Sequence, residues 1–117
     1  MMVYKNSKTF QARIYIAGEY GEAKKICKQF CETGFCVSLS KVDYVYTFGE
    51  ESGLEIKVIN YPRFDRSIEK IKSKSMDLAI NLLTGLSQGS LSIVYDDETL
   101  FMSRREQDLN SINKDNK

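Results

Sequence analysis

Apolar and polar positions alternate along this chain with two different periods, and the change of period marks the predicted elements. From Arg13 to Ala17 every second residue is apolar on one face, Ile14 and Ile16, before Gly18, which predicts a first strand. From Glu19 to Glu32 the apolar residues recur every three or four positions, which predicts a one-sided surface helix. Its apolar positions are Ala23, Ile26, Cys27, Phe30 and Cys31. Thr33-Gly34 follows, and glycine favours the left-handed cap that ends a helix.

The next segment, Phe35 to Phe48, predicts a strand whose apolar residues change face along its length. Val37 and Leu39 occupy odd positions, whereas Val42, Tyr44, Tyr46 and Phe48 occupy even ones. One extra residue inverts the faces of a strand, so we expect a bulge or bend near Ser40-Lys41. A polar loop from Gly49 to Gly53 then leads to a strand in which Leu54, Ile56 and Val58 alternate with charged residues, and the two strands are expected to form a hairpin.

A second helix is predicted from Ser67 to Leu86, after the only proline of the chain. Its second half is apolar over more than one face, and a helix of that kind tends to be covered on two sides. Another subunit is one candidate for the second cover. Beyond the helix, Leu91 to Tyr95 and Thr99 to Ser103 flank the acidic turn Asp96-Asp97-Glu98 as a final hairpin.

The order of predicted elements is β-α-β-β-α-β-β. This order indicates an α+β fold, with a mostly antiparallel sheet and two helices packed on it. We expect residues 11–105 to form a single ligand-binding domain, between a flexible N-terminal arm, residues 1–10, and a disordered C-terminal tail, residues 106–117.

Composition limits the partners of this domain. At 117 residues and 42% apolar residues the chain suffices for one core, and its net charge of +1 argues against a protein that coats DNA or RNA. No apolar run approaches the roughly 20 residues that span a bilayer, and the first residues lack the apolar segment of a signal peptide. We therefore expect a cytoplasmic protein with a small anionic partner and no membrane.

The three cysteines, Cys27, Cys31 and Cys36, are an odd set without an export signal, which disfavours a disulfide framework. Cys27 and Cys31 are one helical turn apart, but no histidine or second cysteine pair completes a zinc tetrahedron. Buried thiols that act as small apolar groups are the favoured interpretation.

The candidate ligand site is the corner around the proline, from Ile59 to Arg66. Guanidinium groups match phosphate oxygens, aromatic rings stack on bases, and amides read base edges. If the end of the last strand meets this corner, within one chain or across a dimer, the arginines form an anion clamp. The candidate ligand-binding residues are Asn60, Tyr61, Arg63, Phe64, Arg66, Asn81, Arg104 and Arg105. Two simpler alternatives remain open, because Phe64 can be a core residue and Asn81 can face water.

Catalysis is not expected, because the chain has no histidine to move protons near neutral pH. We therefore expect no catalytic residue, no cofactor and no metal. The acidic run Asp96-Asp97-Glu98 lacks the spacing of a divalent metal site and is more simply a solvated turn. Gly18-Glu19-Tyr20-Gly21 lacks the three-glycine spacing of a dinucleotide fingerprint.

Six short motifs, in order, resemble the phage Thoeris anti-defence proteins of the first described type. They are Gly18-Glu19-Tyr20-Gly21, Gly34-Phe35-Cys36-Val37-Ser38-Leu39, Tyr44-Val45-Tyr46-Thr47, Ile59-Asn60-Tyr61-Pro62-Arg63-Phe64, Gln88-Gly89-Ser90 and Ser103-Arg104-Arg105. The similarity covers roughly residues 12–105, and the stretch from Asn60 to Phe64 is its most telling part. A proline often follows the motif phenylalanine in that family, where this chain has Asp65.

The resemblance implies a phage-encoded sponge. Such a protein binds and sequesters the cyclic ADP-ribose isomers made by bacterial TIR-domain sensors, including glycocyclic ADP-ribose, without cleaving them, so that the Thoeris effector is not activated. It further implies a homodimer, or a hexamer built as a trimer of dimers, in the cytoplasm of the infected host. Some members also capture cyclic di- or trinucleotides of the CBASS defence system. The alternative from the residues is a phage protein-interaction module that inhibits a host protein through the apolar helix face of residues 76–86.

Overall fold

The computed structural model describes residues 1–108 and shows a five-stranded sheet with two long helices on one face. The elements in chain order are β1 (Gln11–Ile16), α1 (Tyr20–Cys31), β2 (Val37–Tyr46), β3 (Gly49–Ile59), the short 3₁₀ helix η1 (Pro62–Phe64), α2 (Ile68–Gly85), β4 (Ser90–Tyr95) and β5 (Thr99–Ser103). The predicted α+β class and its element order are confirmed.

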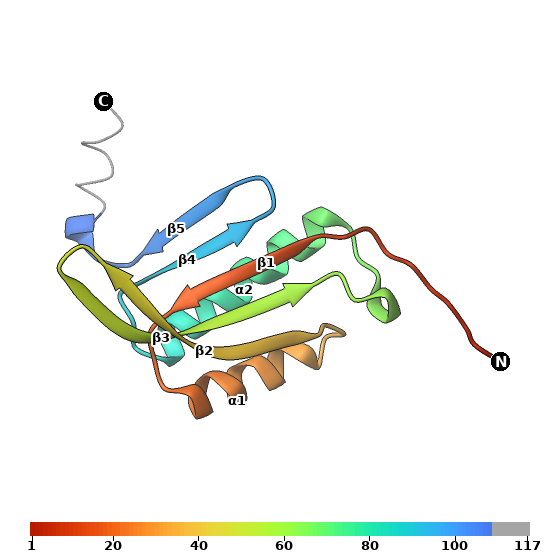
Figure 1. Ribbon diagram of the computed structural model, residues 1–117, viewed down its shortest axis with the longest axis horizontal. Helices are drawn as coiled ribbons and strands as arrows, with labels where there is room; N and C mark the ends of the chain where they lie inside the picture. The colour runs from red at the N-terminus through yellow and green to blue at the C-terminus, as the bar shows by residue number, and fades with distance from the viewer. Residues whose placement is uncertain (109–117) are drawn as a thin grey trace.

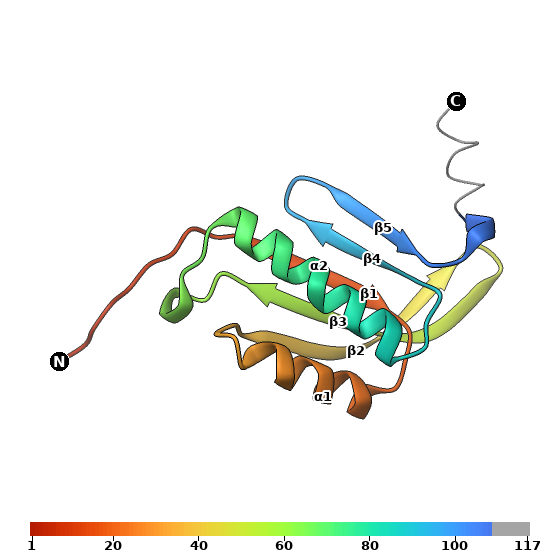
Figure 2. The same cartoon turned by 180° about the vertical axis from the view of Figure 1, so that it is seen from behind.

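Sheet topology places the first strand in the middle. The strand order is β2-β3-β1-β4-β5, and each described neighbour pair is antiparallel (Figure 1). Figure 2 shows α1 and α2 side by side on the same face of this sheet. α2 lies over β1, β3 and β4, whereas α1 packs against β2 and α2. The opposite face of the sheet therefore has no helix over it within residues 1–108.

The core lies between α2 and the sheet. Ile14, Ile56 and Ile93 come from adjacent strands and are completely buried, as are Leu78 and Leu82 of α2. This confirms the predicted inward face of the first strand. The strand begins at Gln11, two residues before the predicted start, because Gln11 and Ala12 also pair with β3.

Both long helices begin at a side-chain cap. The Glu19 carboxylate accepts hydrogen bonds from the backbone N–H groups of Gly21 and Glu22, at 2.9 and 2.6 Å, and these bonds lower its pKa. Ser67 accepts one from the N–H of Lys70 at 3.2 Å and caps α2. Gly34 has a φ of +93°, so the predicted left-handed stop after α1 is confirmed.

The β2–β3 hairpin differs from the prediction. Pairing runs without interruption from Val37 and Val58 to Tyr46 and Gly49, so the expected bulge is absent from this ladder. The predicted five-residue loop is also wrong, because the turn is Thr47-Phe48, with Phe48 at a φ of +65°. Gly53 lies beneath the ring of Tyr44, with no room for a Cβ. The glycine thus marks a close approach within a strand and not a turn.

The change of face along β2 is nevertheless real. Val37 and Leu39 pack against the core on the helix side, whereas Tyr44 meets Tyr15 on the opposite side of the sheet. A regular strand can show both patterns because Val37 and Leu39 lie against the core, whereas Tyr44, farther along the hairpin, contacts Tyr15 on the other face. Two different neighbours, and no slip of register, explain the pattern.

The chain outside the sheet is partly anchored. Met1 to Tyr4 are exposed, but Phe10 is buried, and Ser7 donates a hydrogen bond to the carbonyl of Asn60 at 2.7 Å. Residues 106–108 form a helical turn, and the rest of the predicted tail lies outside the described residues. No helix in residues 1–108 is both long enough and apolar enough to cross a membrane.

The cysteines occupy three different environments. Cys27 is buried, Cys31 is half-buried, and Cys36 is exposed, so the prediction of buried thiols holds only for the first. Burial raises the pKa of Cys27 to about 12, which keeps this thiol protonated and unreactive. All three are free thiols.

Candidate functional site

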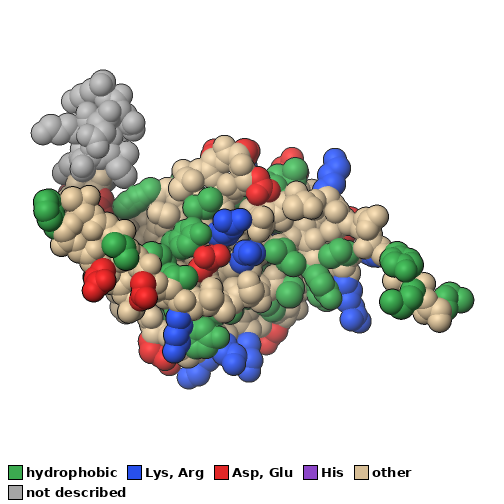
Figure 3. Space-filling model, viewed as in Figure 1, with side chains coloured by type: hydrophobic (Ala, Val, Ile, Leu, Met, Phe, Trp, Pro, Cys, Tyr) green, Lys and Arg blue, Asp and Glu red, His purple; other side chains and the backbone are tan. Residues whose placement is uncertain are grey.

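The open face of the sheet carries a row of side chains contributed by neighbouring strands. Tyr15 of β1 pairs with Glu55 of β3 and with Ser92 of β4, and Ser92 pairs with Phe101 of β5. Directly paired residues point to the same face of a sheet. Figure 3 shows this face, on which hydrophobic side chains are mixed with charged ones of both signs.

A cavity of about 460 Å³ lies on this face, between the β2–β3 hairpin and the β4–β5 end of the sheet. A volume of this size suits a small-molecule ligand. The lining residues are Tyr15, Ile16, Ala17, Tyr44, Glu51, Gln88, Gly89, Ser90, Leu91, Ser92, Phe101 and Arg105. The cavity is the candidate functional site, because it combines aromatic rings, hydroxyl groups and two opposite charges.

Two tyrosines form a fixed aromatic corner of the cavity. The rings of Tyr15 and Tyr44 meet edge to face, with centroids 6.2 Å apart and an interplanar angle of 77°. The Tyr44 hydroxyl donates a hydrogen bond to the carbonyl of Leu54. Burial raises the pKa of Tyr44 to about 12, so the phenol remains neutral at physiological pH. Tyr44 is therefore held in one orientation, which leaves its ring available for a ligand.

Glu51 is the one carboxylate among the described lining residues. It pairs with Tyr44 across the hairpin, so the two side chains project from the same face. Glu51 is exposed and forms no ion pair with any residue in the range 1–108. A carboxylate of this kind can attract a cationic group of a ligand.

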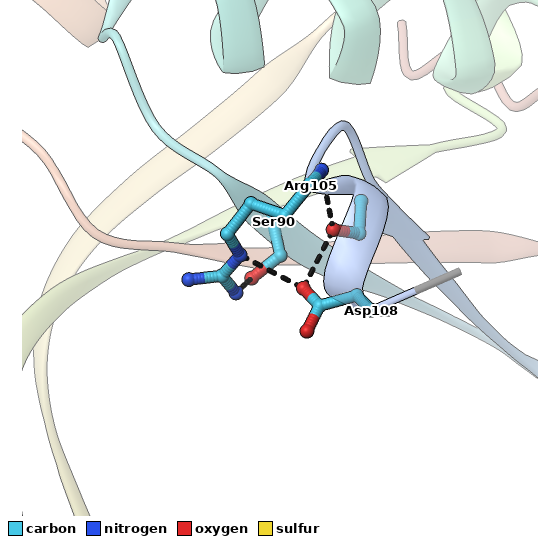
Figure 4. Close-up of polar contacts among 4 residues, drawn as sticks. Ser90, Arg105 and Asp108 are labelled. Atoms are coloured by element: carbon cyan, nitrogen blue, oxygen red, sulfur yellow. Dashed lines mark hydrogen bonds and ion pairs between the residues drawn. The ribbon is translucent and has the colours of Figure 1, made fainter. Parts of the chain in front are cut away.

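Arg105 supplies the positive charge at the other end of the cavity (Figure 4). Its Nε donates to Asp108 Oδ2 at 2.8 Å, and its Nη2 donates to Ser90 Oγ at 2.9 Å. Ser103 Oγ donates to the same carboxylate oxygen of Asp108 at 2.7 Å and accepts from the backbone N–H of Arg105 at 3.1 Å. The hydrogen bond from Ser103, followed by the hydrogen bond and the positive charge of Arg105, lowers the pKa of Asp108.

The proline corner, which the sequence marks as the ligand site, is held together by Asn60. This side chain is only 8% exposed. Its Nδ2 donates to the carbonyl of Lys8 at 2.8 Å and to Asp65 Oδ1 at 3.0 Å, and its Oδ1 accepts from the N–H of Arg66 at 2.9 Å. Both N–H groups of the amide are occupied, so Asn60 joins the N-terminal segment to the start of α2.

The aromatic and basic residues of the corner also contact one another. Tyr61 and Phe64 have ring centroids 6.0 Å apart, and the guanidinium of Arg66 lies over the ring of Phe35 at 5.6 Å. Tyr61 and Arg63 are exposed. Binding of a ligand by these residues remains a prediction.

The candidate residues do not converge within one chain. β3 and β4 are both antiparallel to β1, and β5 is antiparallel to β4, so β3 and β5 run in opposite directions. Their last residues, Ile59 and Ser103, therefore lie at opposite ends of the sheet. Figure 1 shows η1 and the end of β5 at opposite ends of the molecule. Arg105 lines the open-face cavity, whereas Arg104 is exposed and is not among its lining residues. A clamp that joins both arginine groups would require a second subunit.

Asn81 lies in a different place again. It is exposed on α2 and lines a groove between the two helices, together with Ile26 and Ile80. The apolar side of α2 is largely used inside the domain, since Leu78, Leu82 and Leu83 are buried there. Ile80, 49% exposed, is the main apolar side chain that α2 leaves outside in its second half. The helix thus offers a partner much less apolar surface than its sequence indicates.

The acidic turn at residues 96–98 forms ion pairs with a lysine of α2. Lys72 Nζ lies 3.3 Å from both Asp97 and Glu98, and it sits over the ring of Tyr95 at 5.1 Å. Burial of Lys72 lowers its pKa, but the two carboxylates outweigh this effect and raise it. The two carboxylates remain mostly exposed, so the turn is solvated and in addition forms surface ion pairs with α2.

The sequence analysis missed most of the lining residues. Tyr15, Ser92 and Phe101 lie on the outward face of their strands, where the cavity forms. The hydrophobic pattern of these strands identifies only their inward, core-facing residues. The even positions of β2 were the available signal, because large aromatic residues on an outward face need a neighbour. The motif Gln88-Gly89-Ser90, noted for its resemblance, lines the cavity directly.

Two solved structures have the same fold. A phage SAM lyase in complex with S-methyl-5'-thioadenosine matches with a TM-score of 0.60 and 14% sequence identity, over 88% of this chain and 95% of that one. A phage SAM lyase in the apo state matches with a TM-score of 0.63 and 16% identity, over 90% of this chain and 97% of that one. No family model and no curated protein sequence matches the chain.

This similarity corrects the expectation that the chain is not an enzyme. These two solved structures are of a lyase, so the fold itself is compatible with catalysis. The argument from the missing histidines was wrong because it excludes only reactions that need a proton shuttle near neutral pH. The similarity supports a phage protein fold in general and does not extend to the Thoeris type in particular.

Proposed function

We propose that this protein binds an adenosyl compound in the open-face cavity and acts on it as a lyase, with S-adenosylmethionine as the substrate class. The observation that carries the proposal is the composition of the cavity. Tyr15, Tyr44 and Phe101 offer rings for the adenine, while Glu51 and Arg105 offer opposite charges for a zwitterionic ligand. The fold shared with a phage SAM lyase supports the same assignment.

A sulfonium substrate suits a site without histidine. When a bond from carbon to sulfonium breaks, the electron pair moves to sulfur and a neutral thioether leaves, so the leaving group needs no proton. Attack of the substrate's own carboxylate on the γ-carbon forms an ester bond as the carbon–sulfur bond breaks, and the two charges cancel. The thioether product is then S-methyl-5'-thioadenosine, the molecule bound in one of the two solved structures.

Glu51 and the tyrosines have defined roles in this scheme. The Glu51 carboxylate stabilises the positive charge of the bound sulfonium or ammonium group, since opposite charges attract. The faces of Tyr15 and Tyr44 add a cation–π contribution or stack on the base. Holding the amino-acid arm of the substrate in a folded conformation brings its carboxylate and γ-carbon together.

The test is incubation of the purified protein with S-adenosylmethionine, followed by mass spectrometry of the products. We expect S-methyl-5'-thioadenosine to accumulate with time and with protein concentration. Glu51→Gln should slow this accumulation, whereas Glu50→Gln, at the adjacent exposed position, serves as the matched control. Absence of both turnover and binding in the wild-type protein would refute the proposal.

A second proposed ligand is a cyclic ADP-ribose isomer, as the sequence resemblance implies. The cavity favours it through Arg105, whose guanidinium suits phosphate oxygens, and through rings that suit adenine. In this case the protein captures the signal and so blocks the Thoeris effector. Incubation with such isomers, heating, and analysis of the supernatant would show whether ligand is retained and in which chemical form. Failure to retain it would exclude this second ligand.

A further inference from the structure

Arg105 is the most firmly positioned charged group of the cavity. Its side chain is 49% exposed, and its Nε and Nη2 are hydrogen-bonded to Asp108 and Ser90. The remaining nitrogen, Nη1, has no hydrogen bond to any residue within the described range of the chain. A fixed guanidinium with one unoccupied nitrogen can receive an anionic group of a ligand without losing its own orientation.

Gly89 allows the guanidinium to lie against the beginning of β4. A Cβ at this position would lie 3.0 Å from Arg105 Nε, 3.1 Å from its Cδ and 3.2 Å from its Cζ. These distances are shorter than ordinary van der Waals contact, so a larger residue would force the Arg105 side chain to shift by a few tenths of an ångström. The backbone supports the same arrangement, since the N–H of Arg104 donates to the carbonyl of Gly89 at 2.9 Å.

The contact with Asp108 shows which kind of group the Arg105 guanidinium binds. A carboxylate already binds Arg105 Nε, and Ser103 donates to the same carboxylate oxygen. The cavity has one cationic and one anionic lining residue in the described part of the chain, Arg105 and Glu51. This polarity matches a ligand that carries both a carboxylate and a cationic group.

We propose that Arg105 binds the α-carboxylate of the ligand's amino-acid arm and thereby determines specificity. It distinguishes adenosyl compounds that carry this arm from those that lack it. The inference rests on the proposed function, because it assigns the binding of the ligand's carboxylate to one end of the same cavity. Arg104, the exposed neighbour that does not line the cavity, has no part in this selection.

The experiment compares two stable thioethers by isothermal titration calorimetry, S-adenosylhomocysteine with the amino-acid arm and S-methyl-5'-thioadenosine without it. A charge-assisted contact predicts that the wild-type protein binds the first roughly tenfold more tightly than the second. Arg105→Gln should reduce this ratio to near one and leave the affinity for S-methyl-5'-thioadenosine unchanged. Arg104→Gln is the matched control and should retain the full ratio.

Two further variants guard against misfolding. Arg105→Lys keeps the charge but loses the planar fork, and Gly89→Ala displaces the side chain without removing it. Both should reduce the ratio while the far-ultraviolet circular dichroism stays as in the wild type. A wild-type ratio near one, or a ratio that survives Arg105→Gln, would overturn the assignment of Arg105 while nucleoside binding stands. If neither thioether binds, the proposed function and this inference both fail.

Discussion

The two ends of the sheet differ in how they use their polar side chains. At the proline corner the polar groups bind one another, as Asn60 does with Lys8, Asp65 and Arg66. At the hairpin end Glu51 has no ion-pair partner within residues 1–108, and it faces a cavity. The corner has the residue types that ligands require, but its amide is already saturated. Available hydrogen-bonding capacity beside an empty volume is therefore a better guide to a site than residue type alone.

The largest expected effect is on stability, at the corner. Asn60→Ala removes the three hydrogen bonds of a buried amide, which should lower the free energy of unfolding by about 2–3 kcal/mol. Urea denaturation measures this change. Asn81→Ala, at an exposed asparagine, should stay within about 0.5 kcal/mol of the wild type. Equal stability of the two variants would remove the structural role of Asn60.

The next effect is on ligand chemistry, at the hairpin end. Glu51→Gln should lower kcat/KM for S-adenosylmethionine by roughly tenfold or more, because it removes the one carboxylate that lines the cavity. Thermal unfolding should hardly change, since Glu51 is exposed and unpaired in the described structure. Steady-state kinetics beside Glu50→Gln tests this. A large loss of stability in Glu51→Gln would show that the two ends of the sheet do not differ as described.

Tyr44 provides a smaller, pH-dependent test of the cavity wall. Its folded pKa, about 12, lies above its ordinary value of 10.0, so its contribution to stability is complete below pH 10 and is lost as the pH rises toward 12. An absorbance titration of tyrosinate should show late ionisation of Tyr44, and of Tyr95, whose pKa burial also raises. Tyr44→Phe should remove one late step. If it removes an early step instead, Tyr44 is exposed in solution.

The smallest expected effect is on stability, at a buried hydroxyl group that lies outside the cavity. Ser75 of α2 is completely buried, and its hydroxyl has no hydrogen-bond partner in the described structure. It lines no part of the open-face cavity, so it should matter only for stability. Ser75→Ala should raise the free energy of unfolding by about 1 kcal/mol and leave ligand binding unchanged. Chemical denaturation measures this, and a loss of stability would reveal a partner for the hydroxyl.

Local patterns predicted the elements well wherever the conformation depends on residues that are close together in the chain. The period of Ile14 and Ile16 defined the inward face of β1, and Gly34 marked the end of α1. The same reasoning misplaced the hairpin turn, because Gly49 and Gly53 have the composition of a loop. Glycine is needed at these two positions because the rings of Tyr46 and Tyr44 lie against them from the paired strand. A local sequence pattern does not contain this contact.

The candidate site was predicted in part. Arg105 was named from the sequence, and the structure places it in the wall of the open-face cavity. Its partner Ser90 lies at the start of β4, and the pairing of β4 with β5 brings the two side chains together. Asp108 is only three residues farther along the chain, in the turn that follows β5. The convergence of the arginine groups was expected, and within one chain the strand directions separate them.

The sequence by itself determined the fold class, the element order and the absence of histidine, because these follow from composition and from contacts between near neighbours. The tertiary structure alone decided which face of the sheet stays open, where the cavity forms, and which polar groups remain available to a ligand. These properties arise from pairing between strands distant in the chain, as in the row from Tyr15 to Phe101, and no local pattern encodes that register.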